Sequence, residues 1–262
     1  MRYIITATII VLLAALAMPA VSQSGQDLSI QNISAQNLSP QNQSAASQSD
    51  RTWSAQYFSE QADSYFFSGD YDNAVKSYDR ALQLAPNSTV LWNNRGKALA
   101  IQGKFDDAIS SFDKSLSIDS NDLEALNLKA TALSQGKSDF DGAIAIFDQV
   151  LQANASYFDA WIGKGMALAN QGNLYTSLAC FNKATEIKPE DPTGWNNKGV
   201  VLREMGRYQD ALNCFNQAIA LDMNYDTARQ NREYTLQDID EATGSTSSSS
   251  YSSPSQSTTN ML

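Results

Sequence analysis

The sequence predicts an all-α protein made of stacked helical hairpins, and three observations support this fold class. The segments WNNRGKAL at 92–99 and WNNKGVVL at 195–202 are nearly identical, and they start 103 residues apart, which is three periods of 34 residues plus one. A fixed period of this length is typical of stacked helix–turn–helix repeats. Within each period, apolar residues recur four and then three positions apart, as on one face of an α-helix. A glycine follows where the first helix of each hairpin is expected to end.

Alignment at this period divides the chain into five repeats. They span 55–88, 89–122, 123–157, 158–191 and 192–225. The third repeat is one residue longer because GKSDFDGA stands where the second repeat has GKFDDA, and this insertion accounts for the extra residue. The glycines expected to end the first helices are Gly69, Gly103, Gly136, Gly172 and Gly206.

Each repeat combines large and small residues at fixed positions. The first helix opens with a large residue, at Phe58, Trp92, Leu126, Trp161 and Trp195. Four positions later stands a small residue, at Ala62, Gly96, Ala130, Gly165 and Gly199. The second helix has a central aromatic residue, at Tyr78, Phe112, Phe147, Phe181 and Phe215. We expect the small residue to let the two helices of a hairpin approach closely, while a large aromatic ring fills the space beside it.

These columns of residues resemble the tetratricopeptide repeat family, and the resemblance covers about 170 of the 262 residues. It implies a right-handed α-solenoid of five repeats, in which each hairpin buries its apolar face only by stacking on the next. Such an array needs a cap. Residues 226–237 are predicted to form this capping helix, with Ala228 and Tyr234 facing inward, and Trp53 is expected to cover the first repeat. The folded region is thus predicted to span 51–237.

The N-terminal segment is predicted to direct export. Residues 1–22 combine Arg2, an apolar run and the small-residue sequence Ala20-Val21-Ser22, which is the pattern of a secretory signal peptide. An uncleaved membrane anchor is the alternative interpretation. The chain is therefore expected to be exported and to be extracellular or associated with the cell envelope.

Two polar segments flank the predicted solenoid. Residues 23–50 are a linker rich in Gln, Asn and Ser, and residues 238–262 are a Ser/Thr-rich tail. Both are predicted to be disordered because they hold too little apolar surface to offset their conformational entropy. The linker contains the related sequences QNIS, QNLS and QNQS. These sequons suggest N-glycosylation at Asn32, Asn37 and Asn42, or else a plain polar spacer.

The composition narrows the range of functions. The formal net charge of −10 disfavours a nucleic-acid partner. The sequence has no His and only two Cys, Cys180 and Cys214, so we predict no metal site and no disulfide framework. The two cysteines are expected to pack as small buried thiols. No catalytic motif appears, and we expect no enzymatic activity, no catalytic residues and no cofactor.

The paired asparagines after each tryptophan need an explanation, because Asn is a poor helix former. The resemblance implies that the first helices line a concave groove, where Asn in this family often binds the backbone of an extended peptide. An amide side chain offers both donors and an acceptor for such contacts. The predicted groove residues are Asn93, Asn94, Lys97, Asn127, Asn196, Asn197 and Arg203. The alternatives are that Asn is tolerated on a solvated face, or that it bonds to a neighbouring helix.

A basic residue occupies the same position in four consecutive repeats, at Arg95, Lys129, Lys164 and Lys198. In one explanation, the alkyl stem covers the apolar seam and the charged head reaches water. In a second, the bases pair with acids that also recur at one position, at Asp79, Asp113 and Asp148. In a third, the column is a basic ladder that binds acidic ligands. A structural role is the preferred interpretation.

These features together predict a non-catalytic scaffold that binds an extended peptide or a helix of another protein in the concave groove. Membrane contact is expected only through an uncleaved N-terminal anchor. The alternative function is a structural or self-assembling envelope spacer with no dedicated ligand. Repeats of the WNNKG type beside Asn-x-Ser spacers also resemble archaeal envelope proteins.

Overall fold

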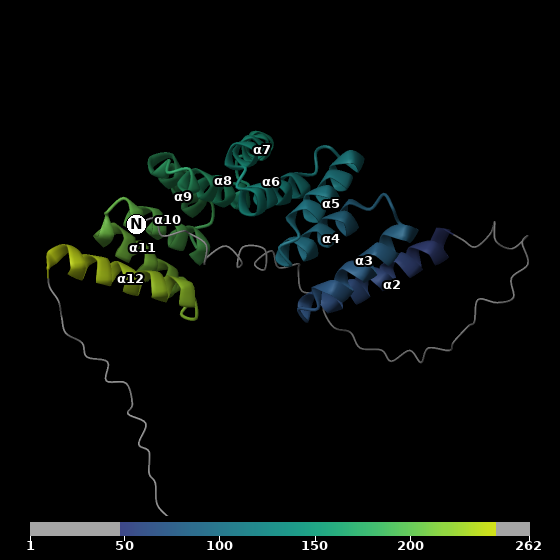
Figure 1. Cartoon of the computed structure of the whole chain (residues 1–262), viewed down its shortest axis with the longest axis horizontal. Helices are drawn as coiled ribbons and strands as arrows, with labels where there is room; N and C mark the ends of the chain where they lie inside the picture. The colour runs from purple at the N-terminus through teal and green to yellow at the C-terminus, as the bar shows by residue number, and fades with distance from the viewer. Residues whose placement is uncertain (1–47, 245–262) are drawn as a thin grey trace, which may run out of the picture. The chain divides into compact units, whose positions relative to one another are not determined.

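The computed structural model describes residues 48–244, and this range contains eleven α-helices and no β-strand (Figure 1). The predicted all-α fold class is confirmed. The helices are α2 (Gln48–Phe67), α3 (Tyr71–Leu84), α4 (Thr89–Ile101), α5 (Phe105–Ile118), α6 (Leu123–Lys137), α7 (Phe140–Ala153), α8 (Phe158–Asn170), α9 (Leu174–Ile187), α10 (Pro192–Glu204), α11 (Tyr208–Leu221) and α12 (Asp226–Thr243).

Several predictions concern segments outside the described residues. These are the signal peptide, the sequons at Asn32, Asn37 and Asn42, most of the linker, the tail from 245 onward and the side chain of Trp53. Helix α2 begins at Gln48, three residues before the predicted start of the folded region. Within 48–244, no helix combines the length and the apolar character that a bilayer span requires.

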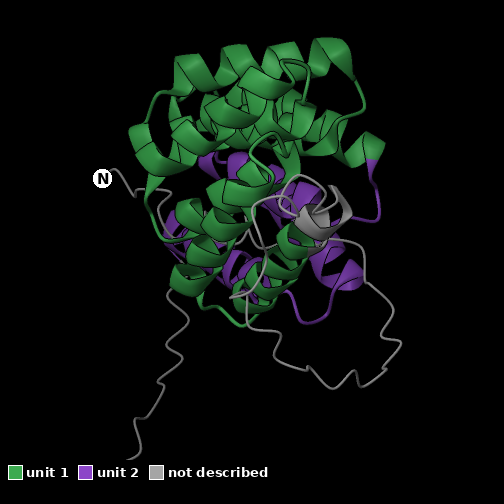
Figure 2. Ribbon diagram, turned by 90° about the vertical axis from the view of Figure 1, so that its right-hand side faces the viewer, with its two compact units in different colours: residues 1–187 green, residues 188–262 purple. Residues whose placement is uncertain are grey.

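The described residues fall into two compact units, divided after residue 187 (Figure 2). In unit 1, which ends there, four hairpins follow one another: α2–α3, α4–α5, α6–α7 and α8–α9. The second helix of each hairpin packs against the first helix of the next, and the first helices α4, α6 and α8 also touch in sequence. In unit 2, which begins at residue 188, α10 and α11 form the fifth hairpin and α12 packs on both helices. Each unit is therefore a stack of helices of the predicted kind.

The ends of the helices follow from local residues. Several helices begin with a side chain that accepts a backbone N–H of the first turn, from Asp70, Ser88, Asp122, Asp139 and Asp191. Four of the five predicted glycines follow the end of a first helix with a positive φ, which an L-residue rarely adopts: Gly69, Gly103, Gly172 and Gly206. The hairpin turns are thus encoded within a few residues of each boundary.

The third repeat ends its first helix differently. Gly136 lies inside α6, and Ser138 adopts the left-handed conformation with φ of 54°, so the prediction that Gly136 ends this helix is wrong. The inserted residue lets α6 continue to Lys137. Gly136 is needed for packing instead, because a Cβ at this position would lie 2.1 Å from Cγ of Phe105 on α5.

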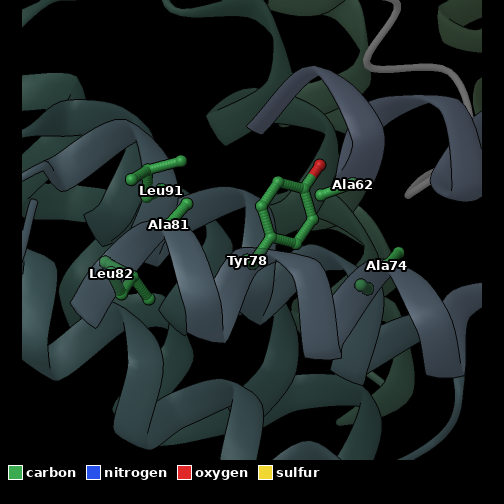
Figure 3. Packing of buried hydrophobic residues seen from close by; sticks show 7 residues of the cluster. Ala62, Ala74, Tyr78, Ala81, Leu82 and Leu91 are labelled. Atoms are coloured by element: carbon green, nitrogen blue, oxygen red, sulfur yellow. The ribbon is translucent and has the colours of Figure 1, made fainter. Parts of the chain in front are cut away.

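The core depends on contacts between a second-helix ring and a small first-helix residue. The rings of the central column are at most 1% exposed: Tyr78, Phe112, Phe147, Phe181 and Phe215. A Cβ on Gly96 would lie 2.4 Å from the Phe112 ring, and a Cβ on Gly199 would lie 2.6 Å from the Phe215 ring. Figure 3 shows the Tyr78 ring beside Ala62, in a buried cluster with Ala74, Ala81, Leu82 and Leu91. The predicted role of the small residues is therefore observed directly.

Helix α12 corrects two predictions. It begins at Asp226 but continues to Thr243, so residues 238–243 belong to the helix and not to a tail. No helix-breaking residue precedes Gly244, which ends α12 with φ of 66°. Ala228 is fully buried as expected, but Tyr234 is 49% exposed and Thr235 is buried in its place. Two helical turns span about seven residues, so the residue below Ala228 on the same face is Thr235.

The sequence of α12 also explains why the repeats stop. Glu233 stands 34 residues after Gly199, where earlier repeats have glycine or alanine. A further second helix could not bring a phenylalanine ring against this position, because the glutamate side chain occupies the space. Leu236, in the column of the buried Leu202, is accordingly 45% exposed.

We predict that Phe147→Ala destabilises the protein more than Trp161→Ala. The Phe147 ring is fully buried, and its removal leaves a cavity that costs about 3–5 kcal/mol. Trp161 is only partly buried, so its truncation removes less buried surface. Urea unfolding followed by circular dichroism would measure both changes. An equal or larger loss for Trp161→Ala would contradict the assignment of the second-helix ring as the main core residue.

Candidate functional site

The asparagines of the first helices are buried. Asn93, Asn94, Asn127 and Asn196 are between 1% and 4% exposed, whereas Asn197 is partly exposed. The prediction that all of these amides lie off the buried surface, facing an open groove, is therefore wrong. The physical reason is the close stacking of the first helices, which touch one another at this position.

Two of the asparagines link consecutive first helices. In unit 1, Asn93 Nδ2 donates to Asp122 Oδ2 at 2.9 Å, and Asp122 Oδ1 caps α6 by accepting the N–H of Ala125 at 3.0 Å. In unit 2, Asn231 Nδ2 of α12 donates to Asn196 Oδ1 of α10 at 2.9 Å. For Asn93 and Asn196 the structure thus shows the alternative in which Asn bonds to a neighbouring helix.

Lys97 of α4 is also buried, with 7% of its surface exposed. Its Nζ donates to Glu124 of α6 and, at 3.5 Å, to Asn94 Oδ1. The Lys97 charge also acts on Asp63 of α2, which accepts a 2.5 Å hydrogen bond from the Tyr78 hydroxyl. Burial raises the pKa of Asp63, and the hydrogen bond from Tyr78 and the Lys97 charge oppose this shift. The Lys97 ammonium therefore bridges helices and is not held out to solvent.

Asn127 of α6 differs from the other buried amides. It occupies the position of Asn93 one repeat later, but Tyr157 stands where Asn93 has Asp122. The Oδ1 atom of Asn127 is buried and has no hydrogen-bond partner among the described residues, and the Oδ1 atom of Asn93 has none either. A buried acceptor without a donor is costly, so the Asn127 amide is a polar group that the scaffold leaves unsatisfied.

Three carboxylates lie around Tyr157, directly before α8. Burial raises the pKa of Tyr157 to about 12, and the negative charges of Asp159, Glu124 and Asp122 add to this shift. We call Asp122, Glu124 and Asp159 the acidic cluster. The sequence analysis did not single out Tyr157, although the tyrosine that replaces an acid in the Asp122 column was a visible signal.

The basic column pairs with acids of the preceding repeat in unit 1. The nitrogen–oxygen distances are 2.7 Å for Arg95 and Asp79, 2.7 Å for Lys129 and Asp113, and 2.5 Å for Lys164 and Asp148. Each pair joins residues 16 positions apart, from a second helix to the next first helix. Three of the bases also lie over the opening tryptophan of their own helix: Arg95 over Trp92, Lys164 over Trp161 and Lys198 over Trp195. These contacts support a structural role for the column.

Arg203 of α10 holds α12 in place. Its Nε donates to Asp238 Oδ2 at 2.5 Å, and its guanidinium lies 5.6 Å from the centre of the Tyr234 ring. Arg203 was predicted to line the groove, and Asp238 was predicted to lie in the tail. The pairing explains why α12 continues past residue 237.

The two cysteines, Cys180 and Cys214, are buried free thiols. Burial raises the pKa of each thiol, which keeps it in the less reactive protonated form.

Comparison with known families and structures identifies relatives of this fold. Tetratricopeptide repeat family models match residues 59–122, 131–192 and 192–225. A tetratricopeptide repeat protein of Thermus thermophilus is 16% identical, with 70% of this chain and 99% of that chain covered and a TM-score of 0.63. PilW, described as a type IV pilus biogenesis factor, is 20% identical, with 74% and 95% covered and a TM-score of 0.61. MamA from Desulfovibrio magneticus RS-1 is 20% identical, with 66% and 97% covered and a TM-score of 0.55. No curated protein sequence matches the chain.

We predict that Asn93→Asp destabilises the protein strongly at neutral pH. The introduced carboxyl would replace the donor that now lies 2.9 Å from Asp122 Oδ2, and two buried carboxylates would face each other. Breaking such a pairing typically costs about 3–5 kcal/mol. The introduced carboxyl would have a raised pKa in the folded state, so the loss should shrink as the pH falls through that pKa.

Urea midpoints at pH 7 and pH 4.5 would test this prediction, with the exposed Asn216→Asp as the control. A similar small change for both variants at pH 7 would show that Asn93 and Asp122 are not coupled.

We further predict that both cysteines are inert in the folded protein. Because they are buried and protonated, their reaction with a disulfide reagent at pH 8 should be on the order of 100-fold slower than after unfolding in urea. Absorbance measurement of the released thiolate would give both rates. A cysteine that reacts in the folded state as fast as a free thiol would contradict its buried placement.

Proposed function

The chain belongs to the tetratricopeptide repeat family, and on this premise we propose that it is a non-catalytic scaffold that binds an extended segment or a helix of another protein. The fold of stacked hairpins implies a role in protein–protein interaction. The first-helix face of unit 1 is the binding surface in this proposal. Export of the protein, with N-glycosylation at Asn32, Asn37 and Asn42, is part of the same proposal and is supported by the pattern of residues 1–22.

The observation that best supports a ligand on this face is the amide of Asn127. Asn93 and Asn196 form hydrogen bonds between helices, with Asp122 and Asn231. Asn127 occupies the same position as these two residues, and its buried Oδ1 has no donor among the described residues. A backbone N–H of a bound segment would supply that donor and remove the penalty of the unsatisfied acceptor.

The positions of the acids support a scaffold over an enzyme. Most acids of unit 1 either begin helices, where the helix dipole favours them, or pair with bases of a neighbouring repeat. Asp70, Asp122 and Asp139 cap helices through direct hydrogen bonds to the backbone. Their roles are thus accounted for by the fold.

We predict that Asn127→Leu abolishes partner capture without destabilising the protein. Leucine has the same branched shape as asparagine and removes the unsatisfied acceptor, so stability should be unchanged or slightly higher. The full-length chain would be cross-linked in its native extract, and captured proteins would be identified by mass spectrometry. The wild type should capture one protein strongly, and the variant should capture less than about a tenth as much.

Gln149→Leu, on the exposed side of α7, is the matched control, because it also replaces an amide by leucine but away from the first-helix face. Equal capture by the wild type and Asn127→Leu would exclude this face as the binding surface. If the wild type captures no other protein and its mass in light scattering rises with concentration, the chain is a self-assembling spacer.

A further inference from the structure

We propose that the segment bound by unit 1 presents a basic side chain, a lysine or an arginine, to Glu124 and Asp159 of the acidic cluster beside Asn127. The inference rests on the proposed function and adds the chemistry of the partner.

The two carboxylates come from adjacent first helices. Glu124 lies in the first turn of α6 and Asp159 in the first turn of α8, and these helices pack against each other. Both charges raise the pKa of the Tyr157 hydroxyl, which places them around one point at the start of α8. The side chain of Glu124 is 45% exposed, so a ligand can reach it.

Asn127 adds an acceptor that awaits a donor. It follows Glu124 by three residues on α6, and residues three apart lie on the same side of a helix. Its side chain is almost completely buried, and its Oδ1 has no partner among the described residues. Lysine and arginine heads are donors without any acceptor, so either one could satisfy the amide oxygen and a carboxylate together.

The preceding repeat step contains an internal example of this recognition. There the ammonium of Lys97 is held by Glu124 and by the amide oxygen of Asn94. One period later the chain has Thr131, whose hydroxyl donates to the backbone oxygen of Asn127 at 2.9 Å. The chain thus supplies its own lysine to one amide and carboxylate pair, and a partner would supply the cation at the next.

The charge of the protein favours the same partner chemistry. A formal net charge of −10 attracts basic segments and repels acidic ones over long distances. A metal ion is not the ligand that this site suggests, because no group of three acidic or thiol side chains in the described residues is arranged to hold one. A single positively charged side chain matches the observed groups better.

A random 12-residue peptide library displayed on phage would test the proposal against the full-length chain. Peptides selected by the wild type should be enriched in lysine and arginine. The tightest one would then be synthesised and titrated by calorimetry against the wild type, Glu124→Gln/Asp159→Asn and Asn127→Leu. We expect the double variant to bind at least tenfold more weakly, and replacement of the basic residue of the peptide by Gln to cause a similar loss.

The control variant is Asp107→Asn/Glu190→Gln, which removes the same two charges at exposed positions outside the cluster. It should bind within twofold of the wild type. Melting temperatures of all variants, measured in parallel, identify any variant that has unfolded; Asn127→Leu, which removes no charge, provides the independent test in that case.

Different failures have different meanings. Selected peptides without basic residues, or equal weakening by both double variants, would overturn the basic-partner inference and leave the scaffold function in place. A wild-type chain that selects no peptide at all while capturing a protein in the native extract would also overturn this inference alone. Failure of both selection and capture would overturn the proposed function as well.

Discussion

The contact between a second-helix aromatic ring and a small first-helix residue is the constraint on which the whole array depends. Each ring is removed from water only if the facing helix has no bulky side chain there, as with Gly96 against Phe112 and Gly199 against Phe215. This contact sets the separation of the two helices in a hairpin. It also sets the end of the array, because Glu233 of α12 occupies the small-residue position and admits no further ring.

Polar links between repeats add specificity to this apolar packing. In unit 1, each base of the column reaches back to an acid 16 residues earlier, and Asn93 reaches forward to Asp122. Exposed ion pairs add little stability, but a buried hydrogen bond or a buried charge is costly when its partner is lost. These links therefore favour one stacking register over its neighbours. The polar residues that resemble a ligand-binding surface in the sequence are for the most part the fastening between repeats.

The region around Asn127 and Tyr157 is the exception to this pattern, and for that reason it bears on function. The Asp122 column changes to tyrosine, the Lys97 column changes to threonine, and the Asn127 amide loses its internal partner at the same place. A repeat that departs from its neighbours in three linked positions is released from the structural role that the others serve. The surplus of acceptors and negative charge there favours a basic ligand group.

The sequence by itself determined the helices, the 34-residue period, the hairpin boundaries near Gly69, Gly103, Gly172 and Gly206, and the small and large columns, because these depend on residues close together in the chain. Only the tertiary structure decided which polar side chains face a neighbouring repeat. Asn93 meets Asp122 across 29 residues and Arg203 meets Asp238 across 35, and no local pattern distinguishes such a partner from solvent. The extent of α12 and the inward position of Thr235 were decided in the same way, because the packing of α12 on α10 and α11 sets which of its faces is buried.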